Sequence, residues 1–345
     1  MNNLKILIAF IIISPFSYSQ DLEEKLDEVK YRNIGPFRGG RSVSSSGVVG
    51  DPLTYYMGTV GGGLWKTTNA GGEWHNISDD YFETSSVGAV AVSESDSKII
   101  YVGMGEHAPR AVTTSYGNGV YKSIDEGKTW EHIGLDKTQQ ISRIIIHPDN
   151  SEVVYVAAQG AINGPTKERG IYKSIDGGKN WKNVLYINKL TGASELSIDY
   201  NNPEILYATM WNHQRLPWKV ISGGDGDGVY KSLDGGESWK KIENGLPNEL
   251  GKMAISISRA NSNKVYLLVE GNSNKRSGGL FVSNNAGDSW QKVSSYAELT
   301  SRAWYYIEVF ADPNDENIVY VLSARAFRSV DGGKNWKRIY SGHGD

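Results

Sequence analysis

Two glutamates, Glu106 and Glu168, are the acidic side chains of this sequence best suited to acid–base chemistry. They lie in two long stretches that follow hydrophobic runs, GEHAPRAVTTSYGNG (105–119) and GAINGPTKERG (160–170). Glycoside hydrolysis usually needs two carboxyl groups that face each other across the scissile bond. We therefore take Glu106 and Glu168 as the candidate catalytic pair, with Glu195 and Glu270 in reserve.

Cations and flat rings accompany these carboxyls in four long stretches, at 105–119, 160–170, 211–228 and 270–279. Aromatic planes with charged neighbours suit sugar rings, and they suit a peptide equally well. Packing of the stretches against each other is the competing explanation. The candidate ligand-binding residues here are His107, Arg110, Arg169, Trp211, His213, Arg215 and Trp218.

A second group of candidates lies at or near the starts of predicted strands. Convergent arginines can clamp a carboxylate or a sulfate through two hydrogen bonds each. Pairing of these arginines with Glu195, or with carbonyl groups of the chain, is the alternative. This group comprises Arg38, Arg41, Arg143, Arg302 and Trp304.

Other chemistry has no support in the sequence. It contains no phosphate-binding loop, zinc-ligand spacing or nucleophile elbow, so we expect neither a metal nor a cofactor. The net charge of -3 and the scattered lysines and arginines argue against a nucleic-acid partner.

Six copies of one pattern, Ser/Thr-x-Asp/Asn-x-Gly-x-x-Trp, separate the stretches that carry these candidates. Each copy is an Asp box between two short strands, so it predicts a hairpin turn. The Asp or Asn side chain bonds the backbone just ahead, and the glycine adopts positive φ. Because Asn replaces Asp twice, we expect a structural role for the boxes. They occupy 67–74, 123–130, 174–181, 232–239, 283–290 and 329–336.

The segments between boxes repeat one order of strands, which gives four strands per unit. Units of this size without helical periodicity predict propeller blades. We therefore expect an all-β fold over residues 31–345, a β-propeller with six Asp-box blades. The ring either closes with six blades or forms part of a larger propeller. The innermost strands should begin near Arg41, Val87, Ile141, Glu195, Lys252 and Trp304.

The N-terminal residues predict export. Lys5 precedes an apolar run at 6–13, and the small residues Ser17 and Ser19 follow, so 1–19 reads as a signal peptide. The apolar run is too short for a membrane span, and the chain has no cysteine to carry a lipid anchor. We expect a periplasmic or extracellular protein without a membrane span, in which 20–30 form a charged lead-in.

The chain resembles the bacterial sortilin-like, Asp-box (neuraminidase-repeat) propellers, which are often labelled glycosyl-hydrolase-like. The resemblance lies in YRNIGPFRGGR (31–41), YYMGTVGGGLWKT (55–67), IYVGMGE (100–106), WNHQRLPW (211–218) and RAWYYIEVFADP (302–313). The chain also loosely resembles the Asp-box xyloglucanases, whose catalytic Asp lies in a Thr-Asp-x-Gly-Gly segment. Val60 occupies that place here, so the acid does not carry over.

In a propeller, inner strands start at one face, and the connections between second and third strands return to it. We call this the loop face and expect the site there, because function concentrates on long loops of rigid scaffolds. From the sequence we expect an exported module that binds a glycan or an extracellular protein or peptide. The alternative is a glycoside hydrolase that uses Glu106 and Glu168 on an extracellular polysaccharide.

Overall fold

The computed structural model describes residues 40–339 apart from 111–113 and 272–276. The predicted signal peptide, the charged lead-in and Arg38 lie outside the described residues.

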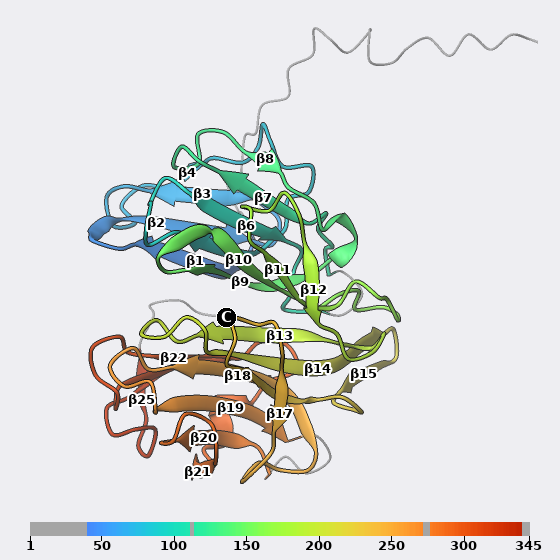
Figure 1. Ribbon diagram of the computed structural model, residues 1–345, viewed down its shortest axis with the longest axis vertical. Helices are drawn as coiled ribbons and strands as arrows, with labels where there is room; N and C mark the ends of the chain where they lie inside the picture. The colour runs from blue at the N-terminus through green and yellow to red at the C-terminus, as the bar shows by residue number, and fades with distance from the viewer. Residues whose placement is uncertain (1–39, 111–113, 272–276, 340–345) are drawn as a thin grey trace, which may run out of the picture. The chain divides into compact units, whose positions relative to one another are not determined.

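The described chain forms six antiparallel sheets in sequence order, each built on four strands in simple meander order, and the fourth has one strand more (Figure 1). The first sheet contains β1 (Ser42–Val48), β2 (Asp51–Thr59), β3 (Leu64–Thr67) and β4 (His75–Asn76). The second contains β5 (Val87–Val92), β6 (Ile100–Met104), β7 (Val120–Ser123) and β8 (Glu131–His132). The third contains β9 (Ile141–His147), β10 (Asn150–Ala158), β11 (Gly170–Ser174) and β12 (Lys182–Leu185).

The fourth sheet has one additional strand. It contains β13 (Thr191–Ile198), β14 (Leu206–Leu216), β16 (Gly228–Ser232) and β17 (Lys240–Ile242), and β15 (Lys219–Ser222) pairs with the far end of β14. The fifth sheet contains β18 (Leu250–Ile257), β19 (Val265–Gly271), β20 (Gly279–Ser283) and β21 (Gln291–Ser294). The sixth contains β22 (Glu308–Ala311), β23 (Val319–Leu322), β24 (Ala326–Ser329) and β25 (Lys337–Ile339).

The six sheets are the blades of a β-propeller, as predicted. The inner strands β1, β5, β9, β13, β18 and β22 all line a central channel of about 540 Å³. Four inner strands begin within two residues of the expected positions, and the fourth begins earlier than expected, at Thr191 instead of Glu195. The sixth begins later than expected, at Glu308, because the 3₁₀ helix η2 (Ala297–Thr300) and a turn precede it.

The Asp boxes build their turns through the predicted side-chain bonds. In the third blade, Ser174 Oγ donates to Asp176 Oδ1 at 2.8 Å. The N–H of Gly178 donates to Ser174 Oγ at 2.8 Å, and the N–H of Asn180 donates to Asp176 Oδ1 at 2.9 Å. In the fifth blade, Asn285 Oδ1 accepts the equivalent bond at 3.0 Å. The turn therefore needs an acceptor oxygen and not a negative charge.

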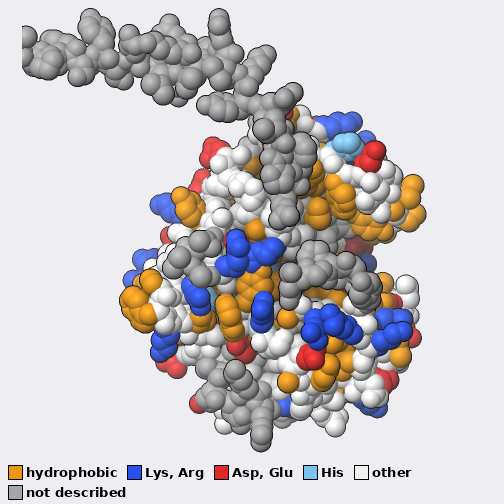
Figure 2. All heavy atoms as spheres, turned by 180° about the vertical axis from the view of Figure 1, so that it is seen from behind, with side chains coloured by type: hydrophobic (Ala, Val, Ile, Leu, Met, Phe, Trp, Pro, Cys, Tyr) orange, Lys and Arg blue, Asp and Glu red, His pale blue; other side chains and the backbone are white. Residues whose placement is uncertain are grey.

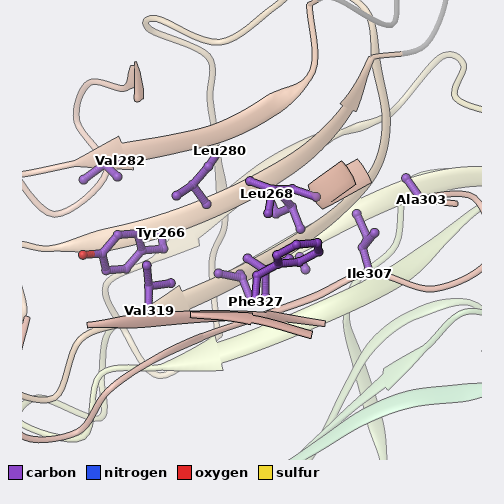
Figure 3. Packing of buried hydrophobic residues seen from close by; sticks show 12 residues of the cluster. Tyr266, Leu268, Leu280, Val282, Ala303, Ile307, Val319 and Phe327 are labelled. Atoms are coloured by element: carbon purple, nitrogen blue, oxygen red, sulfur yellow. The ribbon is translucent and has the colours of Figure 1, made fainter. Parts of the chain in front are cut away.

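Apolar side chains fill the spaces between consecutive blades. Figure 3 shows the cluster between the fifth and sixth blades, in which Tyr266 and Leu268 face Val319 and Phe327. Similar clusters join the first blade to the second, the second to the third, the third to the fourth and the fourth to the fifth. A single blade cannot bury both faces of its sheet, so these clusters hold the blades together.

The box chemistry predicts unequal effects of two substitutions at one position. Asp125→Ala removes the acceptor of the Lys128 and Thr129 N–H groups and should lower Tm by roughly 2–4 °C, as expected for losing a capping interaction. Asp125→Asn keeps one acceptor oxygen and should lower Tm by less. Thermal unfolding followed by circular dichroism measures both, and equal losses would contradict the structural role.

Candidate functional site

Charged side chains from four successive inner strands lie near the loop-face end of the channel. They are Arg143 on β9, Glu195 on β13, Lys252 on β18 and Glu308 on β22. All but Arg143 are buried. With His107 and Tyr306 they form what we call the channel-mouth cluster.

Arg143 connects two carboxylates of this cluster. Its Nε and Nη2 donate to the two oxygens of Glu195 at 2.5 and 2.6 Å, and Nη2 also donates to Glu308. The Arg143 guanidinium is bonded to both carboxylates, so for this arginine the structure shows the expected alternative, pairing with Glu195. The inner strands of the third, fourth and sixth blades are thereby linked across the channel.

Burial changes the protonation of this cluster. It raises the pKa of Glu195 to about 7, which Arg143 opposes and Glu308 reinforces. Burial also lowers the pKa of Lys252 to about 8, although Glu308 and Glu195 oppose that shift. Glu195 and Lys252, whose ordinary pKa values lie far from 7, thus both titrate near neutral pH. Shifts of this kind are common at functional sites.

His107 lies beside these charges without a well-formed hydrogen bond. Its Nε2 is 3.7 Å from Glu308 Oε1. Neither ring nitrogen makes a hydrogen bond of ordinary geometry among the described residues, and only the backbone of Gly88 interacts weakly with the ring. Burial, with Lys252 as the next cause, lowers the pKa of His107 to about 3. A buried polar side chain without a partner is unusual and calls for water or a ligand.

The predicted candidates Arg41, Glu106 and Arg110 are brought together at the same face. Arg41 donates to Glu106 and to the hydroxyl of Tyr305. Arg110 Nε lies 3.5 Å from Glu106 Oε1, and the N–H of Ser115 donates to Glu106 Oε2 at 3.3 Å. Glu106 is fully buried, and its carboxylate contacts Arg41 and two residues of its own connection.

A third group is built on the fourth blade. Trp211 and His213 are buried and stacked, with ring centroids 4.0 Å apart. Trp211 Nε1 donates to Ser222 Oγ at 3.0 Å, and Ser222 in turn donates to Glu270 at 2.6 Å. The Lys252 ammonium lies 5.2 Å from the Trp211 ring centroid, so this stack adjoins the channel-mouth cluster.

The stretch at 211–228, expected to be a loop, is largely a β-hairpin. β14 continues to Leu216 and pairs with β15, from His213 opposite Ser222 to Leu216 opposite Lys219 (Figure 1). Alternating residues and a Pro-Trp turn produce this extension, which the loop interpretation overlooked. At its tip Trp218 is 80% exposed.

The remaining candidates either lie apart from these three groups or form hydrogen bonds within their own loops. Arg169 is fully buried and donates to the carbonyls of Gln159, Ala161 and Gly164, so it closes its own loop. Glu168 accepts from the N–H of Lys167. No contact recorded among the described residues joins Glu168 to Glu106.

Two further candidates lie near the sixth blade. Arg302 is exposed and precedes β22. Trp304 is partly buried, and the Arg215 guanidinium lies 5.4 Å from its ring centroid.

The sequence reasoning missed Lys252, Glu308, Tyr305 and Tyr306 as site residues. A charged residue within the first five positions of an inner strand was the available signal, because Arg143, Glu195, Lys252 and Glu308 share it. These positions are far apart in the sequence, and only the circular arrangement of the blades brings them together.

Within the described residues, no group of three or more His, Asp or Glu side chains is arranged to hold a metal ion. The same part of the chain contains no helix that is long and apolar enough to cross a membrane.

Comparison with known proteins agrees with the predicted resemblance. The family model described as "Sortilin, neurotensin receptor 3" matches residues 118–245. A xyloglucanase from Paenibacillus sp is 20% identical over 83% of this chain and 30% of its own length. Xyloglucanase Xgh74A from Acetivibrio thermocellus is 22% identical over 84% of this chain and 37% of its own. The chain thus spans about a third of these relatives, and its resemblance to Asp-box, glycosyl-hydrolase-like propellers is confirmed.

Solved structures support the same fold. An ancestral GH74 enzyme superposes with a TM-score of 0.62 at 17% identity, over 86% of this chain and 40% of that one. YCF48 bound to D1 peptide superposes with a TM-score of 0.55 at 16% identity, over 90% of this chain and 86% of that one. Similarity at this level of identity establishes the propeller architecture.

Buried His213 should make the fold sensitive to acid. Burial lowers its pKa from the usual 6.5 to about 3, so the folded state binds fewer protons than the unfolded state. The contribution of His213 to the free energy of unfolding is present above about pH 6.5 and is lost as pH falls toward 3. The free energy of unfolding changes by at most about 1.4 kcal/mol per pH unit for this one group. His213→Phe keeps the flat ring and should reduce that slope between pH 6.5 and 4.

Urea unfolding at a series of pH values measures the slope, and His75→Phe at an exposed ring is the matched control. Asp227 acts in the opposite direction, because burial raises its pKa to about 8 and its contribution is lost as pH rises. The comparison is therefore made between variant and parent at each pH. An unchanged slope in His213→Phe would show that this histidine is not the acid-sensitive group.

Proposed function

We propose that the protein is exported and glycan-active, and that it binds an extracellular polysaccharide at the loop face and hydrolyses it. The observation that carries the proposal is the gathering of buried carboxyls and aromatic rings from the second, fourth and sixth blades around the channel-mouth cluster. The xyloglucanase relatives, matched over more than four fifths of this chain, support it. The sequence analysis expected a module that binds a glycan or an extracellular protein or peptide. The proposal keeps the glycan binding and adds a catalytic step.

Aromatic rings near cations supply the binding part of the proposal. Trp218 is exposed at the hairpin tip, Arg215 lies near the Trp304 ring, and the Arg41 guanidinium lies 5.1 Å from the Tyr305 ring centroid. Flat rings bury the apolar faces of sugars, and neighbouring guanidiniums can bond hydroxyl or carboxylate oxygens. Figure 2 shows lysine and arginine side chains near the middle of one side of the molecule, beside exposed apolar side chains.

The catalytic part rests on carboxyl groups. Glu106 and Glu168 remain the proposed pair, and Glu195 is the competing proton donor because its pKa of about 7 keeps a proton available near neutral pH. Position 60 has a valine instead of the catalytic Asp of the Asp-box xyloglucanases, so it supplies no carboxyl. Val60 is buried in the apolar cluster of Val43 and Ala108. Glu106 is buried in the connection that follows β6, and buried Glu195 lines the channel. The activity test below includes each of the three glutamates.

Purified residues 20–345 should release reducing ends from one class of polysaccharide among xyloglucan, uronic-acid polymers and sulfated polymers. Glu106→Gln, Glu168→Gln and Glu195→Gln are compared with Glu131→Gln, a control on the outermost strand β8. Replacing a catalytic carboxyl should lower the rate by about 100-fold or more, and the control should retain the parent rate. The polysaccharide affinity of an inactive variant should persist.

Absence of release from a cooperatively folded protein would remove the hydrolase step. Retained binding to the same polymers would then support the binding module alone. A variant that keeps the parent rate excludes that glutamate from the mechanism.

Peptide binding is a second candidate function, because YCF48 bound to D1 peptide matches this chain over most of both lengths. The same aromatic and cationic residues would then contact a peptide. Competition between peptide libraries and polysaccharides for the purified protein separates the two candidates. Trp218→Ala should weaken whichever ligand the loop face binds.

A further inference from the structure

The central channel has mainly apolar walls and charged side chains at both ends. Its volume of about 540 Å³ lies within the range of about 300–1,000 Å³ that is usual for small-molecule sites. Between the two ends the channel is lined mainly by hydrophobic residues of the inner strands, including Val90, Ile144, Ile146, Leu196, Ile255 and Val309. Walls of this kind favour contact with an apolar molecule over contact with water.

Arg143 lines the channel at the loop-face end. Its Nε and Nη2 are bonded to Glu195 and Glu308, and no bond from its Nη1 is recorded among the described residues. The Arg143 side chain is 25% exposed, whereas those of Glu195 and Glu308 are 4% and 6% exposed. The guanidinium therefore offers N–H donors to a molecule in the channel.

The charges at this end balance one another. Arg143 and Lys252 supply two positive charges, and the ionised carboxylates of Glu195 and Glu308 supply two negative ones. His107 is neutral, because burial lowers its pKa to about 3. A carboxylate ligand would be repelled by the two glutamates, and an ammonium ligand would have no acceptor for the Arg143 donors. A neutral molecule with an acceptor oxygen avoids both penalties.

An ion pair crosses the opposite end of the channel. Arg259 and Glu94 each lie two residues beyond an inner strand, in the fifth and second blades. Arg259 Nη1 donates to Glu94 Oε2 at 3.2 Å, and Nη2 donates to Glu94 Oε1. The guanidinium also lies 3.3 Å from the ring centroid of Tyr200. The side chains of Arg259 and Glu94 are 35% and 26% exposed, so their pairing contributes little stability and can open.

We propose that the channel binds a neutral, mainly aliphatic molecule with one acceptor group, such as a medium-chain ester or ketone. The carbonyl oxygen accepts from Arg143, and the aliphatic part extends along the apolar walls. β9 continues for four residues beyond Arg143, to His147, which gives about 13 Å of wall. The pair of Arg259 and Glu94 lies across the entrance at the other end.

Three six-carbon probes test the chemistry of the ligand. Methyl pentanoate is the neutral isomer of hexanoic acid, so it is matched with hexanoate, and hexylammonium is the cation. The pH is set at about 7.5, between the pKa of Glu195 and that of Lys252, which are about 7 and about 8. Isothermal titration calorimetry gives Kd, and thermal unfolding gives Tm.

Methyl pentanoate at about ten times its Kd should raise Tm by roughly 2–4 °C. Hexanoate and hexylammonium should bind at least about ten-fold more weakly, because each introduces one of the two penalties. Hexanoate or hexylammonium binding as tightly as the ester would overturn the proposal. Absence of ester binding would overturn it as well.

A larger side chain in the channel tests the location. Ala91 lines the channel and is partly exposed, so Ala91→Leu adds carbon atoms where space is available. It should weaken ester binding by about ten-fold or more. Ala297→Leu adds the same atoms at an exposed position of η2 and should keep the parent affinity. Parent affinity in a cooperatively folded Ala91→Leu would overturn the proposal.

The entrance provides a test that leaves the channel walls unchanged. Glu94→Gln weakens the pair with Arg259 and should speed both association and release of methyl pentanoate, measured from NMR line shapes of the ester. Glu298→Gln is the matched control, because it weakens an exposed pair with Arg325, 3.1 Å long, outside the channel. Equal exchange rates in both variants would overturn entry past Glu94. The probes contain no sugar, so these tests succeed or fail independently of glycan binding and hydrolysis.

Discussion

The structure depends on one constraint: a four-stranded blade has two faces and can bury neither alone. Each joined pair of blades meets this constraint with an apolar cluster, a buried tyrosine that bonds the next blade, and a box tryptophan that faces the previous one. The Asp-box turn positions the tryptophan, and in three of the five joined pairs it also contains the carbonyl acceptor, at Glu126, Gly235 and Ala286. A local turn thus controls long-range packing.

This packing also positions the charged groups of the loop face. Inner strands start at that face, so one charged residue per strand is enough to build a cluster across the channel. Burial of Glu195, Lys252 and Glu308 costs desolvation energy, which their mutual pairing and the half-buried Arg143 only partly offset. The raised pKa of Glu195 and the lowered pKa of Lys252 express that cost. Such groups can exchange protons near neutral pH.

The same logic explains where prediction from the sequence worked. The boxes recur with their acceptor and glycine, and each turn is local, so blade number and strand order could be predicted. Glu106 and Arg110 were chosen within one long stretch and Arg41 as a strand-start arginine, and the structure brings the three together. Arg169 was chosen on the same grounds, but its guanidinium is used by the carbonyls of its own loop, which residue type alone could not reveal.

The sequence by itself determined the repeat, its turns and the all-β architecture, because these follow from side chains within eight residues of one another. Only the tertiary structure decided which charges meet. Glu308 is far from Arg143 in sequence, and the two touch because the ring returns the sixth blade to the channel. It also decided that Tyr55 is 40% exposed and Trp74 only partly buried, since burial at those positions depends on the neighbouring chain segments and not on the residues themselves.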